Sequence, residues 1–205
     1  MNFRTALMTM AALCVTAVAM AQGPAYNIPK GSKLAIVVYE DLECPACAAD
    51  DPQIVDASKV YSIPLVRHDY PLPMHPWSMQ AHVYAVYFDS KSPALGEEFR
   101  RWVFAHQREI YLGNLRQKVD AFAASKGQRV PANPDPTGAF AAKIKKDKAL
   151  GDSIGLTHTP TVYIVAATPS GMIHEEVKDI SSLFVTIDRL KKQAGGKAPA
   201  KPAHR

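Results

Sequence analysis

The sequence predicts an α/β protein in which a block of helices is inserted between two groups of strands. An apolar strand leads directly into a Cys-x-x-Cys segment, and a long stretch with helical periodicity follows a second strand. The chain then returns to strands before a last amphipathic helix. Its 205 residues suit one domain that carries an insertion.

The first strand is expected at residues 34–39, a short apolar run rich in β-branched side chains. Pro45 then favours the first turn of a helix, because its missing N–H is not needed there. Cys44 would cap this helix, which is expected to run into residues 48–50, and Cys47 would lie in its first turn. Helix N-termini stabilise a thiolate, so we predict Cys44 as the nucleophile and Cys47 as the resolving thiol.

Residues 1–21 have the pattern of a signal peptide. Arg4 supplies the charge, a short apolar stretch follows, and Ala19-Met20-Ala21 fits the small-x-small cleavage rule. The apolar stretch is too short to favour a permanent membrane span, although an uncleaved anchor is the alternative. Cleavage would remove Cys14 and leave only the Cys-x-x-Cys pair. We expect a periplasmic or otherwise extracytoplasmic protein with no stable membrane insertion after cleavage.

Two other uses of Cys-x-x-Cys remain open at this point. A structural disulfide here would close a tiny loop, which constrains the unfolded chain far less than a long-range bridge. A zinc half-site would need further ligands, and the chain offers no second Cys pair, although histidines such as those at 68, 75, 82, 106, 158 and 174 could in principle complete one. We therefore expect no metal and no other cofactor.

The formal net charge of +5 does not indicate a nucleic-acid partner. The basic residues are spread along the chain, with some concentration at 143–146 and in the tail. Because no nucleic-acid-binding motif accompanies them, they are typical of a solvated surface.

The remaining elements follow from local patterns. A second strand is expected at 63–70, ended by the proline-rich segment 71–76. Helices are expected at 78–88, 93–104, 115–125 and 137–150. Strands return at 161–165 and 172–177, joined by a turn at 168–171, and Ser181-Ser182 begin a final helix. Residues 194–205 are expected to form a disordered tail.

This order of elements resembles the thioredoxin superfamily, and specifically the DsbA-like thiol-disulfide oxidoreductases. Residues 39–47, Tyr-Glu-Asp-Leu-Glu-Cys-Pro-Ala-Cys, are similar to the family's aromatic-x-Asp-x-x-Cys-Pro-x-Cys pattern. Residues 67–72, Arg-His-Asp-Tyr-Pro-Leu, resemble its second strand and following Pro-Leu. Residues 155–161, Gly-Leu-Thr-His-Thr-Pro-Thr, resemble the Gly-x-x-x-Thr-Pro-Thr segment that faces the active site in that fold.

The resemblance implies a thioredoxin fold with a helical insertion between the second strand and the cis-Pro strand. Residues 22–75 would form the first part of the thioredoxin-like domain and residues 151–193 the second. The insertion, residues 76–150, would form a lid beside the redox site.

The resemblance also implies roles for residues around the cysteines. A cis peptide bond before Pro160 would place the backbone of Thr159 beside Cys44, where an extended substrate strand can pair with it. Pro45 and Ala46 would border the same substrate.

Four further side chains could modify the thiols. Asp41 matches the family's acidic position and is a candidate for assisting proton transfer. His158 would lie near the cysteines, where a protonated imidazole favours a thiolate. Glu40 and Glu43 are expected to be solvated charges, and would oppose a thiolate only if they lay close to it.

These features predict an exported enzyme that oxidises the dithiols of unfolded or reduced exported proteins and is reoxidised by a membrane partner. One alternative is a reductase or isomerase kept reduced by a membrane electron donor. The other is a peptide- or metal-binding module in which the thiols are only ligands or a staple.

Overall fold

The computed structural model describes residues 24–195, so the predicted signal peptide and residues 196–205 of the predicted tail lie outside it. The strands are β1 (Leu34–Glu40), β2 (Leu65–Asp69), β3 (Thr161–Thr168) and β4 (Gly171–Glu176). The helices are α1 (Pro45–Tyr61), α2 (Ser78–Lys91), α3 (Pro93–His106), α4 (Leu115–Ser125), α5 (Ala139–Ser153) and α6 (Leu183–Gln193). Three short 3₁₀ turns complete this part: η1 (Pro24–Tyr26), η2 (Gln107–Glu109) and η3 (Ile180–Ser182).

The four strands form one sheet in the order β2-β1-β3-β4, with β1 parallel to β2 and antiparallel to β3. β1 lies inside the sheet and is buried along its whole length, as the apolar run of residues 34–39 requires. In this register Tyr39 lies between His68 of β2 and Thr161 of β3. The segments that follow β1 and β2 and the segment that precedes β3 therefore meet at one edge of the sheet.

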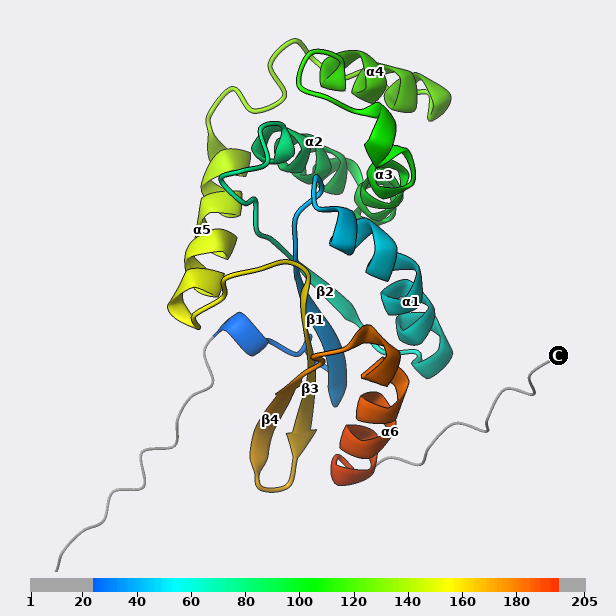
Figure 1. Ribbon diagram of the computed structural model, residues 1–205, viewed down its shortest axis with the longest axis vertical. Helices are drawn as coiled ribbons and strands as arrows, with labels where there is room; N and C mark the ends of the chain where they lie inside the picture. The colour runs from blue at the N-terminus through cyan, green and yellow to red at the C-terminus, as the bar shows by residue number, and fades with distance from the viewer. Residues whose placement is uncertain (1–23, 196–205) are drawn as a thin grey trace, which may run out of the picture.

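Helices cover both faces of this sheet (Figure 1). On one face, Ile36 and Val38 pack against apolar side chains of α1 and α6. On the other face, Val37 and Tyr39 pack with Tyr163 and with apolar residues of η1 and of the segment after α5. The alternation of β1 side chains between two apolar layers explains why its sequence shows no polar period.

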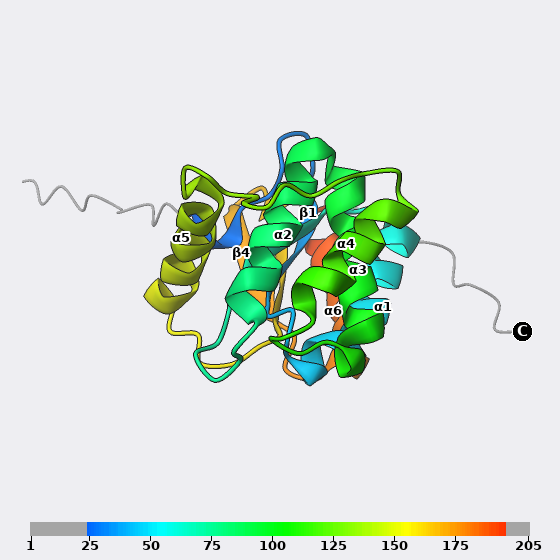
Figure 2. The same cartoon turned by 90° about the horizontal axis from the view of Figure 1, so that it is seen from above.

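The helices α2, α3 and α4 gather at the carboxyl ends of β1 and β2, and α5 returns along the sheet (Figures 1 and 2). Their core contains Phe88, Phe99 and Phe122, with ring centroids 4.7 Å apart for Phe88–Phe99 and 5.2 Å for Phe88–Phe122. Leu42, which follows β1, is fully buried in this same core. The predicted α/β fold with helices inserted between β2 and β3 is confirmed.

Several element boundaries differ from the sequence prediction. α1 continues through Pro52 to Tyr61, because its side chains Ile54 and Ala57 pack into the sheet core. Ala194, expected to open a disordered tail, is buried, and its N–H donates to the Leu190 carbonyl. Within residues 24–195, none of the helices combines the length and apolar character needed to cross a membrane.

Glu40 and Asp69 end two paired parallel strands, and both carboxylates are buried. The prediction that Glu40 is a solvated charge was wrong, because β1 extends one residue further than expected and places Glu40 inside the sheet edge. Burial raises the pKa of Glu40, while Arg67 and Arg100 oppose that rise. Glu43 is only half-buried and accepts a hydrogen bond of 2.7 Å from the Trp77 N–H.

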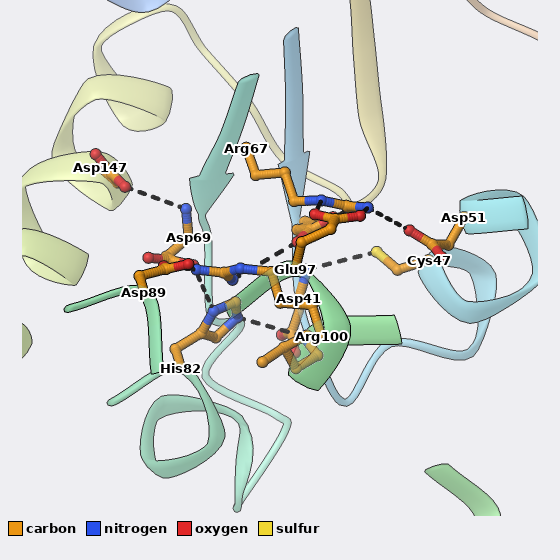
Figure 3. A network of polar contacts seen from close by, with 12 residues as sticks. Asp41, Cys47, Asp51, Arg67, Asp69, His82, Asp89, Glu97, Arg100 and Asp147 are labelled. Atoms are coloured by element: carbon orange, nitrogen blue, oxygen red, sulfur yellow. Dashed lines mark hydrogen bonds and ion pairs between the residues drawn. The ribbon is translucent and has the colours of Figure 1, made fainter. Parts of the chain in front are cut away.

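Two buried arginines neutralise this edge (Figure 3). Arg67 of β2 contacts three carboxylates: Glu40, Asp51 at 2.7 Å and Glu97 at 2.8 Å. Arg100 of α3 lies 2.6 Å from Asp69, 3.0 Å from Asp89 and 3.7 Å from Glu40. The insertion therefore supplies the cation that bridges the two strand ends.

We predict that Arg100→Met lowers the free energy of unfolding by about 3–5 kcal/mol, because it leaves buried carboxylates without their partner. Urea denaturation of the purified variant measures this loss. The matched control is Arg101→Met, which changes an exposed arginine on the same helix. Equal losses in the two variants would show that the buried network does not stabilise the fold in this way.

Candidate active site

Cys44 occupies the N-cap of α1, as the sequence predicted. Its backbone is extended, with φ −77° and ψ 120°, and Pro45 begins the helix. The Cys44 N–H donates to the Asp41 carbonyl at 3.0 Å, and the Cys44 carbonyl accepts from the Ala48 N–H at 3.2 Å. The sulfur therefore lies at the positive end of a 17-residue helix.

The two thiols have opposite acidities. The pKa of Cys44 is lowered to about 5, chiefly because the Cys47 thiol donates a hydrogen bond to it, and the N–H groups of Cys47 and Ala46 add to the effect against the cost of burial. The pKa of Cys47 lies well above its usual range, because the side chain is buried and shares its proton with Cys44. Above about pH 5 the reduced pair therefore combines a Cys44 thiolate with a Cys47 thiol.

The Thr159–Pro160 peptide bond is cis, as the resemblance implied. The Thr159 carbonyl oxygen lies 3.3 Å from the Cys44 sulfur and accepts a hydrogen bond from the protonated thiol. The Thr159 hydroxyl is buried and has no hydrogen-bond partner among the described residues. The Thr159 side chain nevertheless contributes to the lowered pKa of Cys44.

Two pockets flank the N-terminus of α1. One, of about 260 Å³, is lined by residues that include Ala46, His158, Thr159 and Pro160. The other, of about 650 Å³, lies between Pro45 and the end of α3, with Trp77, Phe104 and Ile110 in its wall. Pro45 and Ala46 are both exposed beside Cys44.

Asp41 lies directly beside the thiols, fully buried. Its backbone N–H donates to the Cys47 sulfur at 3.4 Å (Figure 3). Its carboxylate accepts four hydrogen bonds, from the N–H groups of Glu43 (2.8 Å) and Leu72 (2.7 Å), the Ser78 hydroxyl (2.5 Å) and His75 Nδ1 (2.7 Å). Asp41 thus ties the segment before Cys44 to the chain that leads into α2.

Residues 30–188 match the family model described as Thioredoxin. The chain belongs to the thioredoxin family. This match covers the Cys-x-x-Cys helix, the inserted helices and the cis-Pro strand. No curated protein sequence gives a significant match to the chain.

Solved structures of DsbA proteins share this thioredoxin-family fold. Alpha-DsbA1 of Wolbachia pipientis superposes with a TM-score of 0.66 at 18% identity, covering 80% of this chain and 88% of that chain. DsbA2 of Pseudomonas aeruginosa gives 0.59 at 19% identity, covering 78% and 90%. A periplasmic thioredoxin-like protein from Salmonella enterica serovar Typhimurium gives 0.61 at 17% identity, covering 83% and 89%. The resemblance to DsbA-like proteins is therefore confirmed for the fold.

His158, a candidate modulator in this thioredoxin-family site, is exposed. Its carbonyl accepts a hydrogen bond from the Thr161 hydroxyl at 2.9 Å. Across residues 24–195, no hydrogen bond or ion pair joins its imidazole to either cysteine. In the same residues, no group of three or more Cys, His, Asp or Glu side chains is placed to hold a metal ion.

Two side chains contact the backbone of the connection between β1 and α1 in a way that was not predicted. The Leu42 N–H donates to Nε2 of His82 at 3.3 Å. The side-chain amide of Gln107 donates to the carbonyl oxygens of Leu42 at 2.9 Å and Cys44 at 3.0 Å. The sequence carries no signal for either contact, because each joins a side chain of the insertion to main-chain atoms 40 to 65 residues away.

We predict that alkylation of Cys44 in the reduced protein by iodoacetamide accelerates as the pH rises through about 5 and then reaches a plateau. Because the folded pKa is below that of an unfolded thiol, about 8.5, the thiolate also stabilises the reduced fold. This stabilisation is absent below about pH 5, grows above it, and is complete above the unfolded pKa. An alkylation midpoint near 8.5 would contradict the geometry described for Cys44.

We predict that Thr159→Val, which keeps the side-chain shape but removes the hydroxyl, raises the pKa of Cys44. The rise is expected because the Thr159 side chain contributes to the lowered pKa of Cys44, and its upper bound is the worth of one hydrogen bond to a charged group, about one to two pKa units. The pH dependence of alkylation measures the shift. Thr157→Val, at an exposed threonine two residues earlier, is the control and should leave the midpoint unchanged.

Proposed function

We propose that the protein is an exported thiol-disulfide oxidoreductase that oxidises protein dithiols to disulfides through Cys44 and Cys47. The observation that carries the proposal is the Cys44 thiol at the N-cap of α1, with its pKa lowered to about 5. A thiolate that is stable in the reduced enzyme makes the Cys44–Cys47 disulfide a stronger oxidant.

The size of this effect favours oxidation. Lowering a thiol pKa from about 8.5 to about 5 stabilises the reduced form by roughly 2.7 kcal/mol at pH 7. For a two-electron couple this raises the reduction potential by about 60 mV. The same low pKa makes Cys44 a good leaving group when a client disulfide is released.

The reaction proceeds through a mixed disulfide. A client thiolate attacks the Cys44 sulfur, the Cys44–Cys47 bond breaks, and Cys47 leaves as a thiolate that takes up a proton. A second client thiolate then attacks the client sulfur of the mixed disulfide, and Cys44 leaves as its stabilised thiolate. The client loses two electrons and two protons, of which Cys47 keeps one proton and solvent takes the other. The reduced enzyme then holds a Cys44 thiolate and a Cys47 thiol, and a disulfide-bearing membrane partner reoxidises it.

Client binding is assigned to the surface around the N-terminus of α1. An extended client segment would pair with the backbone of Thr159, and Pro160 offers no N–H to compete for it. Pro45 and Ala46 are exposed beside Cys44, so they would contact the residues that flank the client cysteine.

Asp41 and His158 have supporting roles in this proposal. Asp41 would assist proton transfer around Cys47 through its carboxylate, which is hydrogen-bonded to His75, a half-buried side chain, while its backbone N–H contacts the Cys47 sulfur. His158 borders the client pocket, where its protonated form would favour the Cys44 thiolate.

We place this activity outside the cytoplasm. The signal-peptide pattern of residues 1–21 supports export, and one structure of the same fold is described as a periplasmic protein. Reduced or unfolded exported proteins would be the clients, and a membrane protein would return the enzyme to its disulfide form.

The alternative direction, a reductase or isomerase, is favoured by one observation. Asp50 is partly buried near Cys44. The pKa of its carboxyl is raised, mainly because of burial and to a lesser extent because of the negative charge of the Cys44 thiolate. Repulsion between this carboxylate and the thiolate would lower the reduction potential and favour a reductase.

The deciding measurement is the reduction potential of the Cys44–Cys47 pair by equilibration with glutathione. We expect a value toward that of DsbA, about −120 mV, and away from that of thioredoxin, about −270 mV. A value near −270 mV would replace oxidation with reduction as the proposed direction.

The purified disulfide form should also oxidise a reduced, unfolded test protein, and Cys44→Ser should abolish this activity. When Cys47→Ser is instead given a client that already carries a disulfide, its Cys44 thiolate should attack that bond, release one client thiolate and accumulate the mixed disulfide, because no resolving thiol remains. If both serine variants retained the protein's function, the thiols would be ligands or a staple and the enzymatic proposal would fail.

A further inference from the structure

The backbone of Leu42 is held on both sides by side chains of the inserted helices. Leu42 lies in the four-residue connection between β1 and α1, residues 41–44. Its N–H donates to His82 of α2, and its carbonyl accepts from Gln107 of η2. The Leu42 side chain is fully buried in the core of the inserted helices. The connection that carries Cys44 is therefore fixed by the insertion.

The buried carboxylate of Asp69 determines which ring nitrogen of His82 carries the hydrogen and which one contacts Leu42. His82 is fully buried, and its Nδ1 lies 2.8 Å from Asp69 Oδ1 (Figure 3). Burial alone would raise the pKa of Asp69, but Arg100 and His82 hold it well below its usual range, so Asp69 is a carboxylate. A carboxylate only accepts, so Nδ1 carries the hydrogen and the neutral imidazole presents Nε2 as an acceptor to the Leu42 N–H.

Gln107 fixes the two carbonyl groups on the other side. One side-chain amide donates to both the Leu42 and Cys44 oxygens, at 2.9 Å and 3.0 Å. The Cys44 oxygen also accepts from the Ala48 N–H, the first hydrogen bond of the α1 ladder. A carbonyl oxygen turned toward the Cys44 sulfur would repel its thiolate. The Leu42 and Cys44 oxygens instead accept hydrogen bonds from Gln107, and the Cys44 oxygen also accepts one from α1.

We propose that His82 and Gln107 are positioning residues that clamp the Leu42 backbone and so hold Cys44 where the N-terminus of α1 stabilises its thiolate. The inference deepens the proposed function, on which it rests, because it assigns part of the reduction potential of the Cys44–Cys47 pair to the inserted helices. Neither residue touches the client or the reacting sulfur atoms in this proposal. Each acts through the backbone that carries Cys44.

The first test is Gln107→Leu, which removes both amide hydrogen bonds and keeps a side chain of similar length. We expect the pKa of Cys44 to rise and the equilibrium with glutathione to shift toward the disulfide form of the enzyme by roughly three- to tenfold, the loss expected for hydrogen bonds of this kind. Gln117→Leu, at an exposed glutamine of α4, is the matched control and should leave both quantities unchanged.

The second test compares two changes at His82. Gln at this position keeps one donor for Asp69 and one acceptor for the Leu42 N–H, whereas Leu keeps neither. We expect His82→Gln to retain a reduction potential close to that of the wild type and His82→Leu to lower it. If His82→Leu does not fold, Gln107→Leu and His82→Gln still decide the question.

A Gln107→Leu variant that is less stable but has an unchanged glutathione equilibrium and alkylation profile would overturn the inference. The readouts also separate this inference from the proposed function. If the wild-type disulfide form fails to oxidise clients while Gln107→Leu shifts the glutathione equilibrium, the proposed function fails and the clamp stands. If the wild-type disulfide form oxidises clients but Gln107→Leu does not shift the glutathione equilibrium, only the inference about the clamp fails.

Discussion

The structure depends on the neutralisation of two carboxylates, Glu40 and Asp69, that end adjacent parallel strands. Both are removed from water, and two like charges at this edge are tolerated only with cations between them. Arg67 comes from the sheet itself, but Arg100 comes from α3. The sheet edge is therefore completed only when the inserted helices are docked on it. This makes the insertion part of the domain's core and not an appended unit.

The same edge also positions the cysteines, because residues 41–44, which connect β1 to α1, start from it. Asp41 ties the loop to the segment before α2, and Leu42 buries its side chain in the core of the inserted helices. Asp69 orients His82, which in turn holds the Leu42 N–H. A continuous set of contacts thus runs from the buried ion pairs to the residue that caps α1. Thiolate stability at Cys44 depends on the helix end and also on what holds that end in place.

Local patterns were sufficient to predict most elements. The apolar run of β1, the Pro45 start of α1 and the range of α4 follow from periodicity and from turn and cap residues. Grouping Thr159 and Pro160 with the cysteines needed the family resemblance, because nothing local links segments 115 residues apart. The burial of Glu40 was missed because its partners, Arg67 and Arg100, are distant in sequence and a charged residue after a strand usually faces solvent. His82 and Gln107 bind main-chain atoms of Leu42. Because every residue type has the same main-chain groups, such contacts leave no pattern in the sequence around Leu42.

The shared neutralisation of Glu40 and Asp69 has a consequence for how this chain can change during evolution. Arg67 and Arg100 each serve more than one carboxylate, so losing one cation leaves several anions unpaired at once. Residues joined in one such network give strongly non-additive effects when they are replaced. Replacement by apolar residues is tolerated in model systems when the whole group changes together. Substitutions at this edge are therefore expected to be fixed in coordinated sets, while exposed positions of α4 drift one at a time.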